Sequence, residues 1–414
     1  MIKTLKINIL SLGIIIISLL FIPSKGVSQV TNSTVDSLVN AGFENVCSTE
    51  TDTERIYVIQ NSAYKLQGVG IGKALDIIML SGMPVNKQCR VIVLNNNIPQ
   101  ISLICSKKIM AEDSTSLITR SDWDVTYDLG NSWEHVKGIT KKNSSLYKVD
   151  IVVYPELLFR NYILSKMYEF VFNLSPAVEV SLWKGMKLTA QVVIPIHNDY
   201  GENFNQVRPG YLSVSQTFRL PYKTFVTATV GNFNNFRMGF DLRAKHFFNN
   251  ERFFVGARLG YTWRGMFDKW SYYHGKKWTL IGDIEGGYFW PKYNTQFTLR
   301  VERFLLEEYG LRAELVRHFR YASIGFYMMK VQHMDLIANK GFNGGFMFQI
   351  ALPPYRYKRR GYVPRVTTGE FGIRYNAGNE KQYGNTYRSL PDDHYMTENE
   401  FNPYFIKSEI LKKY

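Results

Sequence analysis

The sequence has little of what marks a metalloenzyme or a helical membrane protein. It holds 3 cysteines and 7 histidines in 414 residues, and none of them lies at the short spacing that a metal site needs. After residue 29 no apolar run is long enough for a transmembrane helix. Acidic residues are the minority, 35 against 50 basic ones, which gives a formal charge of +15. The basic excess favours acidic partners such as lipopolysaccharide or an acidic glycan.

Residues 1–28 have the pattern of a secretory signal peptide. Two lysines precede an apolar run from Ile7 to Ile22, and the small residues Gly26 and Ser28 mark a cleavage site before Gln29. The alternative, a retained anchor, is disfavoured because the run is short for a membrane span. We therefore expect export across the inner membrane, which makes nucleic acid the least plausible acidic partner.

The three cysteines, Cys47, Cys89 and Cys105, lie in the N-terminal third. Cys89 and Cys105 flank a predicted hairpin, 90–94 with 101–104, so the two side chains are expected close together. Exported proteins form disulfides readily. Two interpretations stay open, one Cys89–Cys105 disulfide or three free thiols.

Residues 29–110 predict a small α/β domain, which we place in the periplasm, and residues 111–145 a linker or loop. Short helices are expected at 34–40 and 70–80, with a strand at 55–60. The glycine-rich stretch 68–73 lacks the spacing of a phosphate-binding loop, because Ala74 stands where a hydroxyl is needed. We interpret it as a flexible strand-to-helix turn.

Residues 146–375 alternate between apolar and polar side chains, strand after strand. In 238–245, for example, Met, Phe, Leu and Ala occupy one face and Gly, Asp, Arg and Lys the other. A period of two indicates β-strands, and ionised residues on the second face favour water inside and lipid outside. The predicted fold is mainly β, a transmembrane antiparallel β-barrel of about 12–14 strands, with an even number expected for a bacterial barrel. A large soluble β-sandwich is the alternative.

The polar faces of these strands supply the candidate functional residues. We expect these charged side chains to face the lumen, either guiding an acidic glycan or sealing the barrel with salt bridges. They are Arg237, Asp241, Arg243, Lys245, Arg258, Asp283, Glu285, Arg300, Glu302, Arg312 and Glu314.

Two later segments lie outside the strands. A basic, aromatic run follows Leu352, and its side chains are candidates for binding an acidic glycan, or simply form a solvated loop. Its candidate residues are Tyr355, Arg356, Tyr357, Lys358, Arg359 and Arg360. Residues 376–414 predict a polar tail that either hangs in the periplasm or partly fills the lumen.

Residues 173–196, NLSPAVEVSLWKGMKLTAQVVIPI, resemble the YjbH/GfcD family of outer-membrane β-barrels, as does 341–350, GFNGGFMFQI, with the Arg/Tyr-rich run after it. The resemblance covers roughly residues 146–375 and carries no catalytic signature. It implies a role in export or assembly of a surface exopolysaccharide or capsule, with periplasmic polysaccharide-export proteins as partners.

We therefore expect a non-enzymatic outer-membrane barrel, without metal or other cofactor, in contact with lipid and lipopolysaccharide. A general porin and a subunit of another envelope secretion machine are the alternatives. A hydrolase is disfavoured because the histidines considered for it are scattered and no nucleophile motif accompanies them. They are His197, His246, His274, His318 and His333.

Overall fold

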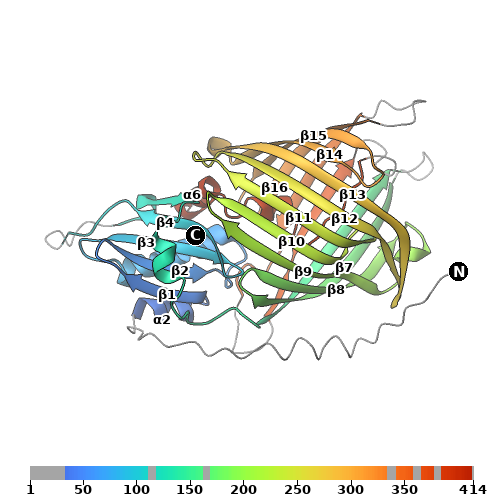
Figure 1. The fold of residues 1–414 in the computed structure, drawn as a ribbon. Helices are drawn as coiled ribbons and strands as arrows, with labels where there is room; N and C mark the ends of the chain where they lie inside the picture. The colour runs from blue at the N-terminus through green and yellow to red at the C-terminus, as the bar shows by residue number, and fades with distance from the viewer. Residues whose placement is uncertain are drawn as a thin grey trace. The chain divides into compact units, whose positions relative to one another are not determined.

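The computed structural model describes residues 33–110, 118–161, 168–332, 342–357, 365–376 and 384–412. The predicted signal peptide lies outside these residues. The described chain is mainly β and forms a five-stranded and a fourteen-stranded sheet, both within one compact unit, Asn32–Tyr414 (Figure 1). No helix in the described part of the chain is long and apolar enough to cross a membrane.

The smaller sheet forms the predicted α/β domain and extends past its predicted end. Its strands, in hydrogen-bonded order, are β1 (Glu44–Glu50), β2 (Glu54–Gln60), β3 (Gln88–Asn95), β4 (Ile98–Cys105) and β5 (Trp123–Thr126). Only β2 and β3 pair in parallel, because α3 (Gln67–Ser81) crosses between them. β5 and α4 (Ser132–Val136) fall where we predicted a linker. Trp123 and Val136 are fully buried there, so this polar stretch belongs to the domain.

Three helices cover one face of this sheet, and one of them comes from the other end of the chain. α2 (Ser33–Asn40), α3 and α6 (Pro403–Leu411) share an apolar core with it. The glycine-rich stretch lies inside α3, so the predicted strand-to-helix turn is wrong. A Cβ on Gly68 would lie 2.3 Å from the Cβ of Glu409, so glycine there lets α6 approach α3 closely.

The three cysteines are free and buried. Cys89 and Cys105 share the apolar core on one face of the sheet and Cys47 lies in the cluster on the other, where each acts as a small apolar side chain. The Cys89–Cys105 disulfide is therefore not formed in this structure. Burial raises the pKa of the Cys47 thiol to about 11, and it also raises the pKa of Cys89 and Cys105.

The larger sheet is a barrel built almost entirely from antiparallel neighbours. Its strands are β6 (Val149–Asn161), β7 (Tyr168–Trp183), β8 (Met186–Asn198), β9 (Arg208–Leu220), β10 (Thr224–Phe233), β11 (Arg237–Phe247), β12 (Phe253–Asp268), β13 (Ser271–Trp290), β14 (Thr295–Arg303), β15 (Tyr309–His318), β16 (Ala322–Gln332), β17 (Phe342–Ala351), β18 (Arg365–Thr368) and β19 (Glu370–Asn376). In Figure 1 the labelled strands β8 to β13 lie in this order across the wall that faces the viewer.

The barrel is nearly closed, with an odd number of strands. β18 and β19 flank Gly369 and are two halves of one strand, so the fourteen labelled strands make thirteen positions in the wall. β19 pairs antiparallel with β17, while β18 pairs in parallel with β6 through four residues. The expectation of an even number was wrong. With an odd number of antiparallel strands the first and last run in the same direction, so only a parallel pair can join them.

The outer face of the barrel is apolar and exposed. Phe240, Leu259 and Ile284 are 57%, 52% and 70% exposed, and the residues that alternate with them are mostly glycine or polar. This is the reverse of the α/β domain, whose large apolar side chains are buried between sheet and helices. The predicted alternation of strand faces is thus confirmed.

The α/β domain lies against one end of the barrel. Glu251, in the β11–β12 turn, accepts hydrogen bonds from Thr126 Oγ1 at 2.6 Å and the Tyr127 amide at 2.9 Å. Arg219 donates to the carbonyls of Pro99 and Gln100 at 3.0 and 2.6 Å. The ring of Tyr127 stacks on Phe247 at 4.2 Å. We call this end of the barrel the domain end, and the opposite one the far end.

Candidate functional site

The inner face of the barrel carries the predicted charged residues in register. Arg243 on β11 pairs with Arg258 on β12, which pairs with Asp283 on β13 and then Glu302 on β14. Two residues along, Lys245 begins a row that continues through Glu285, Arg300 and Arg312. By register, burial and alternation with the exposed apolar residues, the structure places all eleven candidates on the inner face: Arg237, Asp241, Arg243, Lys245, Arg258, Asp283, Glu285, Arg300, Glu302, Arg312 and Glu314.

Asp241 is the centre of the first charged cluster. The residue is 2% exposed, and its carboxylate accepts from Arg243 Nε at 2.9 Å and from Arg258 Nε at 2.8 Å. Ser389 Oγ donates to the same carboxylate at 3.0 Å. A carboxylate this deeply buried is stable only because two guanidinium groups meet it.

A second cluster joins β13, β14 and β15. Arg300 donates to Glu285 at 2.7 Å and to Glu314 at 2.6 Å, so one guanidinium bridges two strands. Arg312, which is 2% exposed, lies 2.8 Å from Glu314 and stacks over Tyr327. Charge-assisted contacts of this kind fix side chains more firmly than neutral ones.

The lumen is occupied by the chain's own C-terminal segment, residues 384–402, which runs from the far end to the domain end. Successive residues of the segment contact the wall at points progressively nearer the domain end. Asn385 accepts from the Leu305 amide in a far-end loop, and Asp393 meets Arg243 at 2.6 Å further in. Glu398 meets Lys245 at 2.9 Å, and Asn399 contacts His318 near the domain end at 3.1 Å. Of the two predictions for residues 376–414, lumen filling matches this segment.

Apolar contacts hold this segment at both ends. At the far end Tyr387, 1% exposed, stacks on Phe233 at 5.2 Å, with the Arg258 guanidinium 4.5 Å from its ring. At the domain end the segment continues into α6, where Ile406 and Ile410 are fully buried in the core of the α/β domain. Between these anchors the contacts are mostly polar, although Tyr395 packs against the apolar cluster of Val316, Tyr327 and Met347.

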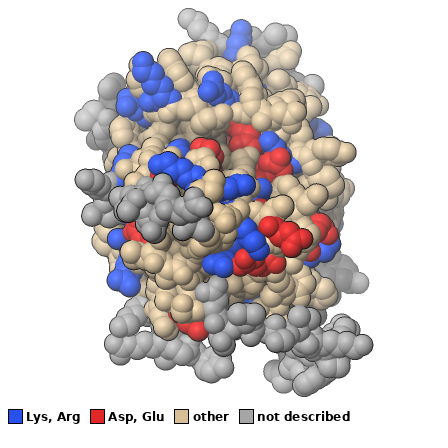
Figure 2. Space-filling model, turned by 90° about the vertical axis from the view of Figure 1, so that its left-hand side faces the viewer, with Lys and Arg blue, Asp and Glu red and all other residues tan. Residues whose placement is uncertain are grey.

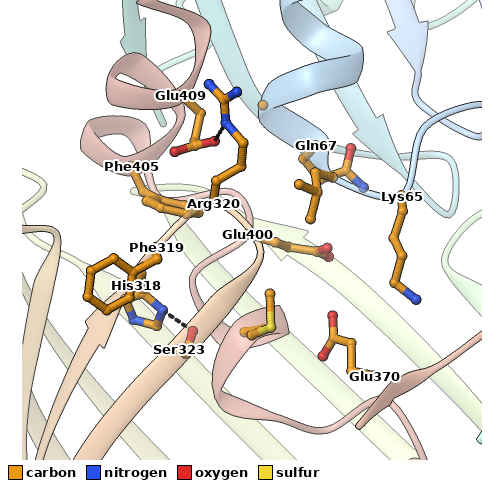
Figure 3. A pocket seen from close by; sticks show the side chains of 13 residues that line it. Lys65, Gln67, His318, Phe319, Arg320, Ser323, Glu370, Glu400, Phe405 and Glu409 are labelled. Atoms are coloured by element: carbon orange, nitrogen blue, oxygen red, sulfur yellow. Dashed lines mark hydrogen bonds and ion pairs between the residues drawn. The ribbon is translucent and has the colours of Figure 1, made fainter. Parts of the chain in front are cut away.

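A small pocket opens where α3, the β15–β16 turn, β19 and the C-terminal segment meet (Figure 3). Figure 3 shows the carboxylates of Glu370 and Glu400 and the amine of Lys65 turned toward one another. Lys65 donates to the Gly369 carbonyl at 2.8 Å, and burial lowers its pKa to about 8. Burial, aided by nearby Glu370 and Asp392, raises the pKa of Glu400 to about 8. Buried carboxylates this close cannot all ionise at neutral pH.

The basic run after Leu352 serves as a strap between barrel and domain where it is described. The Tyr355 carbonyl accepts from the Lys65 amide at 2.9 Å, and the Tyr357 amide donates to the Ala63 carbonyl at 2.7 Å. Arg356 stacks over the Tyr64 ring. Lys358, Arg359 and Arg360 lie outside the described residues. In the space-filling view turned toward the α/β domain, basic and acidic side chains are intermixed rather than gathered by sign (Figure 2).

The histidines considered for hydrolysis do not come together. His318 is buried and bonded to Ser323 and Asn399, whereas His197, His246 and His274 lie on three other strands. His333 lies outside the described residues. Within the described ranges, no group of three His, Cys, Asp or Glu side chains is arranged to hold a metal.

The sequence analysis missed the other half of the lumen network. Lys187 on β8 contacts Asp392 at 2.7 Å, and Asp393 and Glu398 meet further cations. The signal was present, since residues 389–399 contain three carboxylates and no lysine or arginine in a chain of charge +15. In this chain the acidic stretch pairs with cations of the barrel wall.

Comparisons with protein-family models, with curated proteins and with solved structures find no match. The resemblance to the YjbH/GfcD family therefore stays a hypothesis.

Proposed function

We propose that this chain is a non-enzymatic outer-membrane barrel that assists export or assembly of a surface exopolysaccharide or capsule and does not work as an open porin. The observation that carries the proposal is a barrel with an exposed apolar wall and a lumen filled by its own charged segment. Lipid on the outside and a largely hydrogen-bonded polar network inside are what such a wall requires.

The lengths of the hairpin turns support one orientation. Five of the six connections at the domain end, at 184–185, 221–223, 248–252, 291–294 and 319–321, have two to five residues, and the sixth, 352–364, is the thirteen-residue strap that contacts the α/β domain. At the far end, connections reach nine residues, as at 199–207. Transmembrane barrels have short periplasmic turns and longer outer loops. We therefore place the α/β domain in the periplasm, where it is available to export proteins.

The filled lumen disfavours the porin alternative. Tyr387 is clamped at the far end and α6 is buried at the domain end, so the segment cannot leave without breaking apolar contacts at one of them. The polysaccharide role comes from the family resemblance, and the mixed charges of the lumen are compatible with it. A subunit of another envelope machine would share the same geometry and differ in its partners.

Deletion of the gene in the native bacterium tests the export role. We expect loss of surface polysaccharide, measured as extracted uronic acid or capsule staining, and recovery on complementation with the intact gene. Unchanged polysaccharide in the deletion strain would overturn the proposal.

Planar-bilayer recording of the purified full chain separates the sealed barrel from a porin. We expect almost no steady ion current. A large, stable current from the unmodified protein would favour the porin.

A further inference from the structure

In the middle of the lumen, the C-terminal segment contacts the barrel wall largely through its side chains, as a bound peptide ligand would. Backbone hydrogen bonds within 390–402 close turns inside the segment, such as Glu398 N to His394 O and Asn402 N to Asn399 O. Its wall contacts are made largely by side chains. Three of these are carboxylates of Asp392, Asp393 and Glu398, which meet Lys187, Arg243 and Lys245 at 2.6–2.9 Å.

The wall cations that hold the segment also have carboxylate partners on the wall itself. Lys187 also lies 3.5 Å from Glu179, and Arg243 donates to Asp241 at 2.9 Å. Lys245 lies 3.9 Å from Glu285. Each cation that holds the segment thus has a second partner on the wall, so displacing the segment strands no buried charge.

The cations also have donor capacity left over. Arg243 Nη2 and Arg312 Nη2 are buried, and neither has an acceptor among the described residues. Arg312 is 2% exposed. Buried guanidinium N–H groups favour ligands that bring carboxylate or hydroxyl oxygens.

Aromatic rings lie among these cations. Tyr154 donates to Glu179 at 2.6 Å, beside Lys187, while Phe254 lies under the Lys245 amine at 3.9 Å. Tyr327 lies under Arg312. All three aromatic side chains are buried on the inner face. Flat apolar rings between cationic donors suit a chain of sugar rings that carry carboxylates better than an acidic peptide.

We infer that the inner wall around Lys187, Arg243 and Lys245 is a binding track for an extended acidic glycan, and that residues 389–399 hold it as an internal substitute ligand. The inference rests on the proposed function and adds a substrate class and a site to it. An acidic glycan that enters the track competes with Asp392, Asp393 and Glu398 for the same cations.

Hydrogen exchange of residues 389–399 in the full chain, reconstituted in vesicles, tests this competition. Polygalacturonate is the probe, neutral dextran of similar length the control, and polyglutamate the peptide control. We expect polygalacturonate to speed exchange in this segment about tenfold, the effect of losing roughly one charge-assisted contact, with no change from dextran. High salt should weaken the effect of polygalacturonate.

A matched pair of variants links the effect to the track. Lys187→Gln combined with Arg243→Gln should weaken binding of labelled polygalacturonate about tenfold. Lys277→Gln, on a side chain 77% exposed and paired only with Glu307 among the ion pairs described, should leave binding unchanged. The inference is overturned if polygalacturonate leaves exchange unchanged, if dextran acts equally, if polyglutamate alone displaces the segment, or if the double variant binds normally.

The two proposals fail separately. Displacement in vesicles together with normal surface polysaccharide in the deletion strain would overturn the export role alone. Loss of polysaccharide without displacement in vesicles would overturn the track alone.

Discussion

The barrel and the α/β domain use opposite arrangements of the same side chains. The barrel turns Phe240, Leu259 and Ile284 outward and buries Asp241 and Arg312, whereas the domain buries Leu38, Ile71 and their neighbours between sheet and helices. The C-terminal segment belongs to both regions. It is polar from 389 to 399, where it lies in the barrel, and apolar on one side of α6, where it enters the domain. Each stretch thus lies in surroundings that suit its composition. Such agreement between local sequence and overall fold is typical of natural proteins.

The largest effect is expected from the charged core of the barrel. Asp241→Ala leaves two partly buried guanidinium groups without their shared, fully buried carboxylate and should cost about 3 kcal/mol of unfolding free energy or somewhat more. Urea unfolding in lipid vesicles, followed by loss of the heat-modified gel band, measures it. Asp268→Ala, at an exposed hairpin tip, is the control. Equal stability of the two variants would mean that the cluster adds little.

The apolar core of the domain should give a somewhat smaller loss. Ile406→Ala opens a cavity at a fully buried position of α6 and should cost about 3 kcal/mol, most of it as local detachment of α6. Protease cleavage within 384–412 measures that detachment. Leu411→Ala, at a side chain 48% exposed, should cleave at the rate of the unmodified protein. Equal cleavage of both variants would contradict the assignment of α6 to the domain core.

Two exposed leucines distinguish a lipid-facing wall from a water-facing surface. Leu259→Arg on the barrel should cost about 2 kcal/mol or more in vesicles, because a charge at mid-bilayer depth is unfavourable. Leu80→Arg on the domain, at a side chain 86% exposed, should change stability by about 0.5 kcal/mol at most. If both changes are equally mild, the barrel wall does not face lipid.

A pH-dependent effect is expected at the pocket between the two regions. Because the pKa of Glu400 is raised from 4.5 to about 8, its protonated form adds stability that is fully present below pH 4.5 and is lost as pH rises through 8. Glu400→Gln should therefore raise Tm relative to the unmodified protein at pH 8.5 and match it near pH 4.5. Scanning calorimetry at both values measures the difference. A Tm difference that does not change with pH would contradict the raised pKa.

Local periodicity explains which parts of the structure were predictable. The alternation of apolar and polar residues in β11, β12, β14 and β15 predicted these strands, their outer faces and their lumen-facing charges. A period of two can be recognised within a few consecutive residues. Helices α2 and α3 and the β3–β4 hairpin were predictable for the same reason. β1 and β5 were not, since β5 has only four residues and β1 carries few apolar side chains, and both are ordered by burial of residues such as Val46 and Trp123 in the domain core.

Pairings between distant residues explain what was missed. Nothing near Asp392 in the sequence indicates Lys187, and nothing near Gly68 indicates Glu409. The expectation of an even number of strands was wrong for a related reason, because β18 and β19 change partners at a single glycine while the chain continues in one direction. Such pairings depend on the assembled fold. In the sequence they are indicated only by local composition, as in the acidic stretch 389–399.

Because α6 packs into the α/β domain, completion of the domain core depends on folding of the barrel. The α/β domain is first in the chain, yet its core includes Ile406 and Ile410 from the distant end, delivered through the barrel. A newly made chain therefore carries an uncovered apolar face on α3 until the barrel has formed around the returning segment. Contacts so far apart in sequence form late and slowly. On the proposed placement of the domain in the periplasm, we expect chaperones there to recognise that face during assembly, and a chain truncated before α6 to stay bound to them.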